Sequence, residues 1–230
     1  MKMSMSIKTR SLVFATFFVN CIVVGLLLAS LITEHWIEAE ARMPNSANAT
    51  GTVHFGLFSG KKTLDRGIGS RSSKIDVPAT LRSEPNFMSY WLWLGTFVGT
   101  GLGLFSSAIG GIASVMKSAS PQKKHGTMCL LFFSNGASAI SQLLAFLCWI
   151  GEFYGYLKTN VLMAEDRKKT WHTINLSDFG HSFYFVLAGI LFVIVNIVIL
   201  VVVLAMEKKE RRPVRQEPVD EKAAGAIMLY

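Results

Sequence analysis

Charge is missing from the most apolar parts of this chain. Its 23 Lys and Arg and its 15 Asp and Glu all lie outside four runs of 23 to 27 residues, at 11–33, 90–116, 127–151 and 181–206. About 20 apolar residues are enough for a helix to cross the hydrocarbon core of a bilayer. A helix that is apolar on every side is typical of a membrane span. The pattern predicts an all-α membrane protein built on a bundle of four transmembrane helices.

The same runs lack proline as well as charge, and these absences argue against several functions. A transporter usually carries broken helices or intramembrane charges along its substrate path, so a small transporter or pore is disfavoured. The chain also lacks a nucleotide-binding loop, a histidine box and a nucleophile with an identifiable base. We therefore expect no enzymatic activity, no catalytic residue and no cofactor.

Cysteine is scarce, and none lies between the apolar runs. Cys21, Cys129 and Cys148 all lie inside them, which predicts small packing side chains and no disulfide in an outer loop. Palmitoylation is the alternative for Cys129, which is near the end of its run. The histidines are scattered without the spacing of metal ligands, so solvated or interfacial side chains and no metal site are expected. They are His35, His54, His125, His172 and His181.

Basic residues are unevenly distributed among the segments that flank the runs. Residues 1–10, 117–126 and 207–230 hold 12 basic and 5 acidic side chains, whereas the longer segments 34–89 and 152–180 hold 11 and 10. Short cytoplasmic segments are enriched in Lys and Arg, so we predict that the first group, with both termini, is cytoplasmic and the second extracellular. The net charge of +8 then reflects topology, not nucleic-acid binding. A cleaved signal peptide is the alternative for the first run, which is longer than a typical signal core.

Two stretches of the first outer segment alternate apolar and other residues, as half-buried strands do. Their apolar positions are Ile37, Ala39 and Ala41 in one stretch and Val53, Phe55 and Leu57 in the other. The turn-rich stretch 44–51 separates them, so we expect a small extracellular antiparallel sheet that rests on the helix ends. Residues 59–83 are polar and rich in Gly, Ser and Lys, which predicts a mobile segment.

Two tripeptides fit the acceptor pattern for N-glycosylation, and both lie in predicted outer segments. They are Asn48-Ala49-Thr50 and Asn175-Leu176-Ser177. Asn48 is well separated from the nearest run and is expected to be modified. Asn175 lies close to the fourth run, so little or no modification is expected there.

The second run carries small residues at every fourth position: Gly95, Gly99, Gly103, Ser107 and Gly111. This spacing lets a second helix approach closely in lipid. Packing inside the bundle is favoured for this seam, and an interface with another copy or another membrane protein is the alternative. Four amide side chains in the runs are expected to tie helices together by hydrogen bonds, namely Asn20, Asn135, Gln142 and Asn196.

The last segment offers two kinds of contact. Its basic start, with Lys208, Lys209, Arg211 and Arg212, is expected to anchor the fourth span beside an anionic leaflet. Its end, Met228-Leu229-Tyr230, has apolar residues at the last position and two before it. Such an end can add as a strand to a PDZ domain and present its carboxylate, which makes it a candidate PDZ-binding motif.

Several short motifs resemble those of a known group of membrane proteins. Trp36 after the first run and Phe55-Gly56-Leu57-Phe58 resemble the tryptophan and Gly-Leu-Trp signature of the claudin superfamily, whose fold is a four-helix bundle with an extracellular sheet. The closer resemblance is to the clarins, small tetraspan glycoproteins of this claudin-like group. Clarins share a Tyr-Gly-Leu-Phe-x-Gly stretch, a preceding acceptor asparagine, a His-Gly pair and a Leu-Met-Tyr end. The matching positions here are Phe55 to Gly60, Asn48, His125-Gly126 and Met228 to Tyr230.

The resemblance implies a function as well as a fold. The loop cysteines of claudins and vertebrate clarins are missing, which indicates a divergent or invertebrate member. A clarin-like chain is expected to be a non-enzymatic plasma-membrane organiser, linked in sensory cells to hair bundles, synapses and actin. Its expected partners are the lipid bilayer, other membrane proteins including copies of itself, and PDZ or actin-linked scaffolds. The alternatives are an auxiliary subunit of an ion channel or receptor and a claudin-like adhesion protein.

Overall fold

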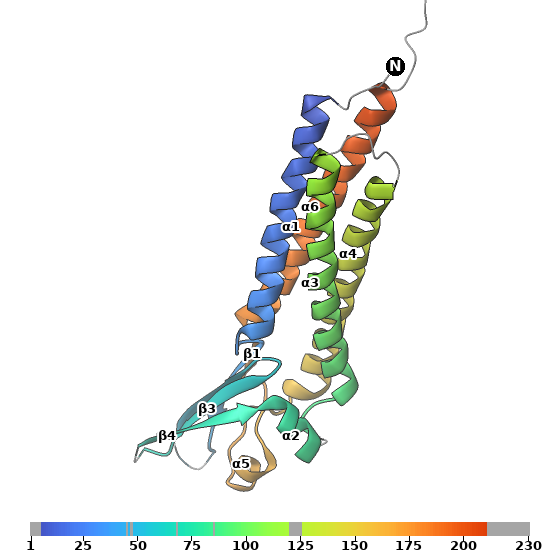
Figure 1. Cartoon of the computed structure of the whole chain (residues 1–230). Helices are drawn as coiled ribbons and strands as arrows, with labels where there is room; N and C mark the ends of the chain where they lie inside the picture. Colours follow the sequence, from blue (N-terminus) through green and yellow to red (C-terminus); the bar gives the residue numbers. More distant parts are fainter. Residues whose placement is uncertain are drawn as a thin grey trace, which may run out of the picture.

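A computed structural model describes residues 6–44, 46, 48–67, 69–84, 86–119 and 126–210 of the chain. Four long helices lie side by side, and a sheet stands at one end of them (Figure 1). The helices are α1 (Ile7–Ile32), α3 (Tyr90–Ala119), α4 (Gly126–Glu152) and α6 (His181–Glu210). All four are long and apolar enough to cross a membrane. The predicted four long apolar helices and the small antiparallel sheet are therefore confirmed.

The helices extend a few residues beyond the uncharged runs because their ends are stabilised by polar groups. The hydroxyl of Ser6 accepts a hydrogen bond from the backbone N–H of Thr9 and caps α1. Lys208 and Lys209 lie in the last turn of α6, where cations oppose the negative end of the helix dipole. Helix α4 continues into a π-helical turn, η1 (Phe153–Leu157). Among the helices, α1 packs against α3 and α6, and α4 packs against the same two.

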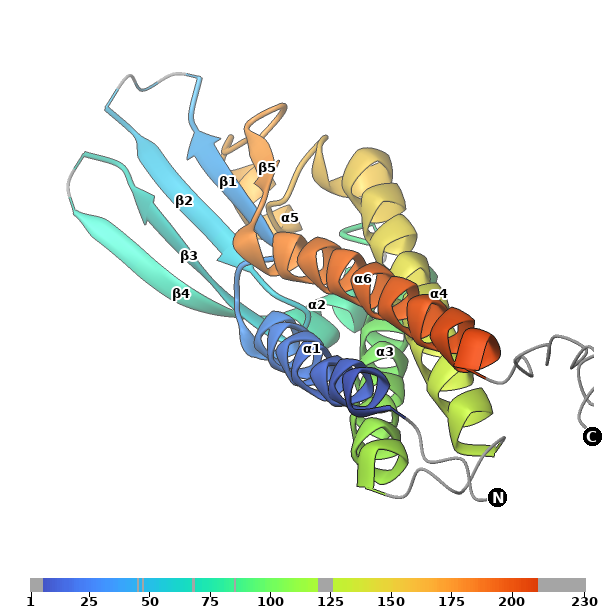
Figure 2. The same cartoon turned by 90° about the horizontal axis from the view of Figure 1, so that it is seen from above.

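The sheet has five antiparallel strands in the order β4-β3-β2-β1-β5 (Figure 2). Strands β1 (Ile37–Arg42) and β2 (Thr50–Phe55) form a hairpin, and β5 (Ser177–Phe179) comes from the segment just before α6. In β1 the side chains of Ile37, Ala39 and Ala41 are buried, while those between them face solvent. This burial pattern agrees with the alternation in the sequence.

The prediction of a mobile segment at 59–83 is wrong. This stretch forms β3 (Ser59–Asp65), β4 (Ser70–Asp76) and the short helix α2 (Val77–Ser83). In β4 only Ile75 is buried, so the strand lacks the apolar alternation by which strands are recognised. Its ladder with β3 supplies the backbone hydrogen bonds, and the carboxylate of Asp76 caps α2 by accepting from the N–H of Ala79 at 3.0 Å.

The second outer segment folds against the first. Its short helix α5 (Ala164–Lys168) carries Asp166, whose carboxylate pairs with the ammonium group of Lys62 on β3. Both side chains of this pair are largely buried. The carboxylate of Glu84, just after α2, accepts from the N–H of Ala164 at 2.8 Å. The two segments thus form a single cap over one end of the helices.

Candidate functional site at the junction of sheet and helices

Trp36 anchors the first strand to the helices. Its indole is fully buried, and Nε1 donates to the carbonyl oxygen of Ser30 in α1 at 2.7 Å. The ring meets Trp149 of α4 edge-on, with centroids 4.9 Å apart. Its backbone N–H donates to the carbonyl oxygen of Phe55 at 2.9 Å. Trp36 and Phe55, which belong to the two separate stretches of the loop motif, therefore meet beside α1 and α4.

The rest of the motif forms the tight connection between β2 and β3. A Cβ atom on Gly56 would clash with the carbonyl oxygen of Thr33, so only glycine allows this approach to the end of α1. Leu57 is fully buried, and its carbonyl oxygen accepts from Nε1 of Trp93 on α3 at 2.9 Å. Phe58, by contrast, is 44% exposed. The motif residues thus fix the sheet onto α1, α3 and α4.

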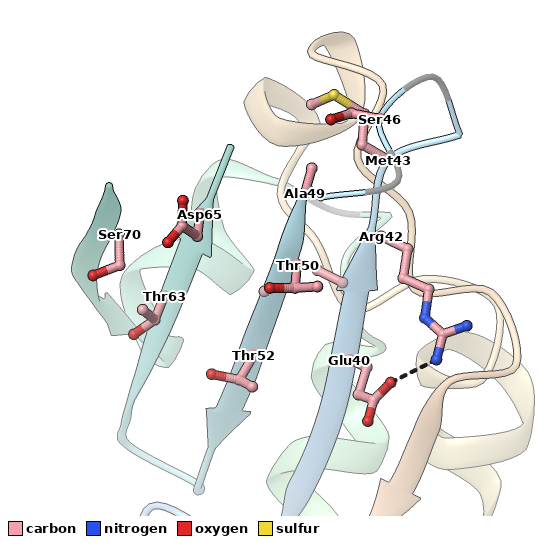
Figure 3. A pocket seen from close by; sticks show the side chains of 12 residues that line it. Glu40, Arg42, Met43, Ser46, Ala49, Thr50, Thr52, Thr63, Asp65 and Ser70 are labelled. Atoms are coloured by element: carbon pink, nitrogen blue, oxygen red, sulfur yellow. Dashed lines mark hydrogen bonds and ion pairs between the residues drawn. The ribbon is translucent and has the colours of Figure 1, made fainter. Parts of the chain in front are cut away.

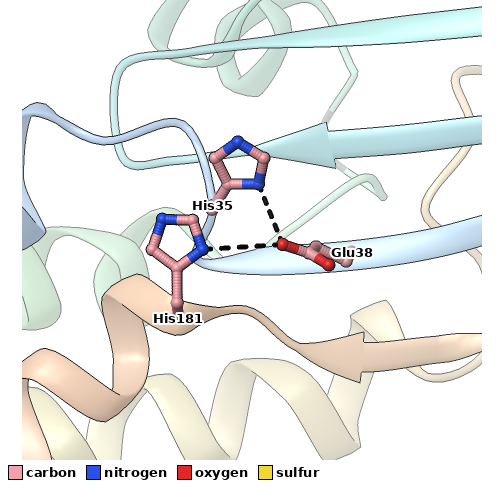
Figure 4. A group of neighbouring side chains, drawn as sticks. All are labelled: His35, Glu38 and His181. Carbon is pink, nitrogen blue, oxygen red and sulfur yellow. Dashed lines mark hydrogen bonds and ion pairs between the residues drawn. The ribbon is translucent and has the colours of Figure 1, made fainter.

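Three of the five histidines gather beside this junction. The ring of His35 stacks between those of His54 and His181, with centroids 4.5 Å apart on each side. Glu38 of β1 completes the group (Figure 4): its Oε1 lies 2.9 Å from Nδ1 of His35 and 3.8 Å from Nδ1 of His181. Sequence spacing gave no sign of this histidine cluster, because its members come from the α1–β1 connection, from β2 and from the start of α6.

The backbone brings the histidine cluster together. A Cβ atom on Gly180 would clash with the carbonyl oxygen of His35, so glycine permits the start of α6 to approach β1. The same carbonyl oxygen accepts from the N–H of Ser182 at 2.9 Å. Burial lowers the pKa of His54 from its ordinary value, and the neighbouring imidazole of His35 lowers it further. The neutral ring is therefore favoured at His54, which suits a stacked arrangement.

An open hollow of about 650 Å³ lies across the strands (Figure 3), at the end of the sheet away from the four long helices. Its floor is polar: Thr52 of β2 lies opposite Glu40 of β1 and Thr63 of β3 in the strand register. The carboxylate of Glu40 pairs with the guanidinium of Arg42 at 2.9 Å. Asn48 is exposed in the turn that borders this hollow. Such a surface suits contacts with another macromolecule more than enclosure of a small substrate.

Polar side chains deep among the helices bond across helix boundaries. Nδ2 of Asn196 on α6 donates to Oδ1 of Asn135 on α4 at 2.8 Å and to the carbonyl oxygen of Thr16 on α1 at 3.5 Å. Within α1 itself, Nδ2 of Asn20 donates to the same carbonyl at 2.9 Å. The hydroxyl of Thr16 also lies 2.7 Å from that of Ser114 on α3. All four spans contribute to this network.

The seam of small residues on α3 faces helices of the same chain. A Cβ atom on Gly99 would lie 2.7 Å from the carbonyl oxygen of Ser141, and one on Gly103 would lie 2.8 Å from Cγ of Gln142, both on α4. Ser107 bonds the hydroxyl of Ser138 at 2.6 Å. At the two ends of the seam, Gly95 faces Cys148 of α4, and Gly111 faces Asn20 of α1.

The opposite end of the bundle carries a buried ion pair. Lys117 of α3 is 1% exposed, and its ammonium group lies 3.4 Å from a carboxylate oxygen of Glu207 on α6. Two of the predicted features lie outside the described residues. They are the candidate PDZ-binding motif Met228-Leu229-Tyr230 and His125, the first residue of the His-Gly pair. Cys21, Cys129 and Cys148 are free thiols.

These features are those of a multi-pass membrane protein with a folded cap at one end. Comparison with protein-family models and with curated protein sequences finds no match for this chain.

Proposed function

We propose that this chain is a non-enzymatic tetraspan organiser of the plasma membrane, resembling the clarins. The cap lies outside the cell, and both termini lie in the cytoplasm. The protein assembles other membrane proteins around its cap and helices. The tail, through Met228-Leu229-Tyr230, links that assembly to PDZ or actin-associated scaffolds.

The polar network among the four spans is the observation that carries this proposal. Its amides and hydroxyls bond to one another and to backbone carbonyls across helices, which is how polar groups hold membrane helices together. The four apolar runs contain no charged residue, whereas transport paths usually do. The four helices thus serve to hold the cap in place. The polar hollow of the cap is the surface that contacts partner proteins.

The experiment that tests the proposal is partner capture by the full-length protein. Thr52→Arg places a long cation in the centre of the hollow, where Thr52 is exposed between Glu40 and Thr63. The proteins are purified from native membranes in mild detergent, and their partners are identified by mass spectrometry. The wild type is expected to capture adhesion proteins or cytoskeleton-linked membrane proteins, and Thr52→Arg is expected to capture markedly less of them.

Ala79→Arg is the matched control, because Ala79 is exposed on α2, outside the hollow. It adds the same side chain and is expected to keep the wild-type partners. Equal capture by all three proteins would contradict a role for the hollow. A channel or receptor recovered in fixed ratio with the chain would instead favour the auxiliary-subunit alternative.

A further inference from the structure

We propose that His35, Glu38 and His181 form a binding site for a divalent transition-metal ion of the Zn²⁺ class. Two imidazole nitrogens and one carboxylate oxygen are a donor set that zinc uses in proteins, with a fourth position left for water or for a partner's group. The ligand atoms of the three residues all lie within 4.8 Å of one another. They come from the α1–β1 connection, from β1 and from the start of α6.

The spacing of the ligand atoms suits one tetrahedral ion. Zinc–ligand bonds of about 2.1 Å at tetrahedral angles place neighbouring ligand atoms about 3.4 Å apart. The two distances from Oε1 of Glu38, 2.9 Å to Nδ1 of His35 and 3.8 Å to Nδ1 of His181, lie on either side of that value. Both nitrogens already point toward the same carboxylate oxygen (Figure 4). To bind one ion, the stacked rings of His35 and His181, now 28° from parallel, turn about their side-chain bonds until both Nδ1 atoms face it.

Charge and access also favour a cation. The cluster borders an open hollow of about 410 Å³, which shares Glu40 and Thr52 with the hollow of Figure 3. Its carboxylates are Glu38, Asp178 and Glu40, the last of which pairs with Arg42. The three proposed ligand side chains are between 36% and 51% exposed, so an ion reaches them from solvent. When it binds, each imidazole must present an unprotonated Nδ1, and any proton held there is released.

His54 lies beside the site but is not assigned to it. It stacks on His35, with the two rings only 5° from parallel. It is not one of the three residues whose ligand atoms converge. A phenyl ring can replace it in the stack without donating a ligand atom.

Zinc binding to the full-length protein in detergent, after treatment with a chelator, tests the proposal. Titration calorimetry with zinc chloride is expected to give one ion per chain, and the ion is expected to raise the unfolding temperature because it joins β1 to α6. His181→Ala and Glu38→Gln are each expected to weaken binding by about tenfold or more, since the first removes a ligand atom and the second replaces a carboxylate oxygen with a neutral amide oxygen, a poorer zinc ligand. His54→Phe is expected to bind zinc as the wild type does.

Cobalt provides an independent readout of the coordination. Co²⁺ bound tetrahedrally to the wild type and to His54→Phe is expected to give strong visible absorption, which His181→Ala lacks. Circular dichroism and gel filtration confirm the fold of each variant, and Glu38→Gln, which keeps the size of the side chain, serves if His181→Ala does not fold. The site would be overturned if the wild type did not bind zinc, or if His181→Ala and Glu38→Gln bound zinc as tightly as the wild type does. Loss of binding in His54→Phe would overturn the assignment of ligands.

Discussion

At the scale of single residues, the cap depends on a buried ion pair that joins two distant segments. Lys62 on β3 and Asp166 on α5 have side chains only 15% and 7% exposed. A buried charge that loses its partner remains shielded from water. Removing one partner therefore lowers the free energy of unfolding by more than the intact pair contributes to it.

Lys62→Met is therefore expected to destabilise the cap by about 3–5 kcal/mol, because it leaves the Asp166 carboxylate buried and unpaired. Unfolding in detergent, followed by tryptophan fluorescence, measures the effect. The double variant Lys62→Met, Asp166→Leu is expected to recover most of the loss. Lys61→Met is the control, since Lys61 is exposed on the same strand. Equal losses for Lys61→Met and Lys62→Met would show that the pair contributes nothing specific.

The pattern of residues also determines which parts of the structure could be predicted from the sequence. The four spans were predictable because charge is excluded from lipid, and β1 because Ile37, Ala39 and Ala41 alternate with polar residues. Strand β4 could not be predicted, because it lies at the sheet edge and exposes nearly all of its side chains. The histidine cluster could not be predicted either, because only the three-dimensional approach of α6 to β1 brings His181 beside His35.

At the scale of elements, α3 is the helix around which the bundle packs most closely. Gly99 brings its backbone against Ser141 and Ala145 of α4, and a Cβ atom at this position would lie 3.0 Å from the Cβ atom of Ala145. Gly101, two residues further along the same helix, has no atom within 4 Å of where its Cβ would be. The two glycines thus provide a matched pair on one span.

Gly99→Leu is expected to force α3 and α4 apart, at a cost of about 1–3 kcal/mol from overpacking. The protein is then expected to be retained inside the cell, and surface biotinylation measures the loss. Gly101→Leu, with the same added side chain on an open face, is expected to reach the surface at the wild-type level. A normal surface level of Gly99→Leu would mean that close packing of these two helices is dispensable.

At the scale of the whole molecule, a membrane crossed by all four helices would separate the cap from the opposite helix ends, since the helices run between them. The distribution of basic residues predicts that the cap side is extracellular. Asn48, exposed in the β1–β2 turn, is then placed within reach of the glycosylation machinery.

Glycosidase treatment of the cell-expressed protein is expected to increase its mobility on a gel, and Asn48→Gln is expected to abolish that shift. Asn175→Gln is the control. Asn175 is also exposed, but it lies just before β5, close to the start of α6. A shift that is lost only in Asn175→Gln would assign the glycan to the second segment. No shift in the wild type would remove this support for an extracellular cap.

The pairing of β5 with β1 has a consequence for how the protein is made. Ribosomes deliver the chain from its N-terminus, so β1 and β2 emerge long before residues 177–179, which fill the other edge of β1. Until then Ile37 to Ala39 present unpaired backbone groups, the kind of edge that attracts chaperones or other strands. Gly180 and α6 follow directly, and the backbone N–H of Ser182 then donates to the carbonyl oxygen of His35. Translation of the last span, and not formation of the first hairpin, is the step that completes the cap.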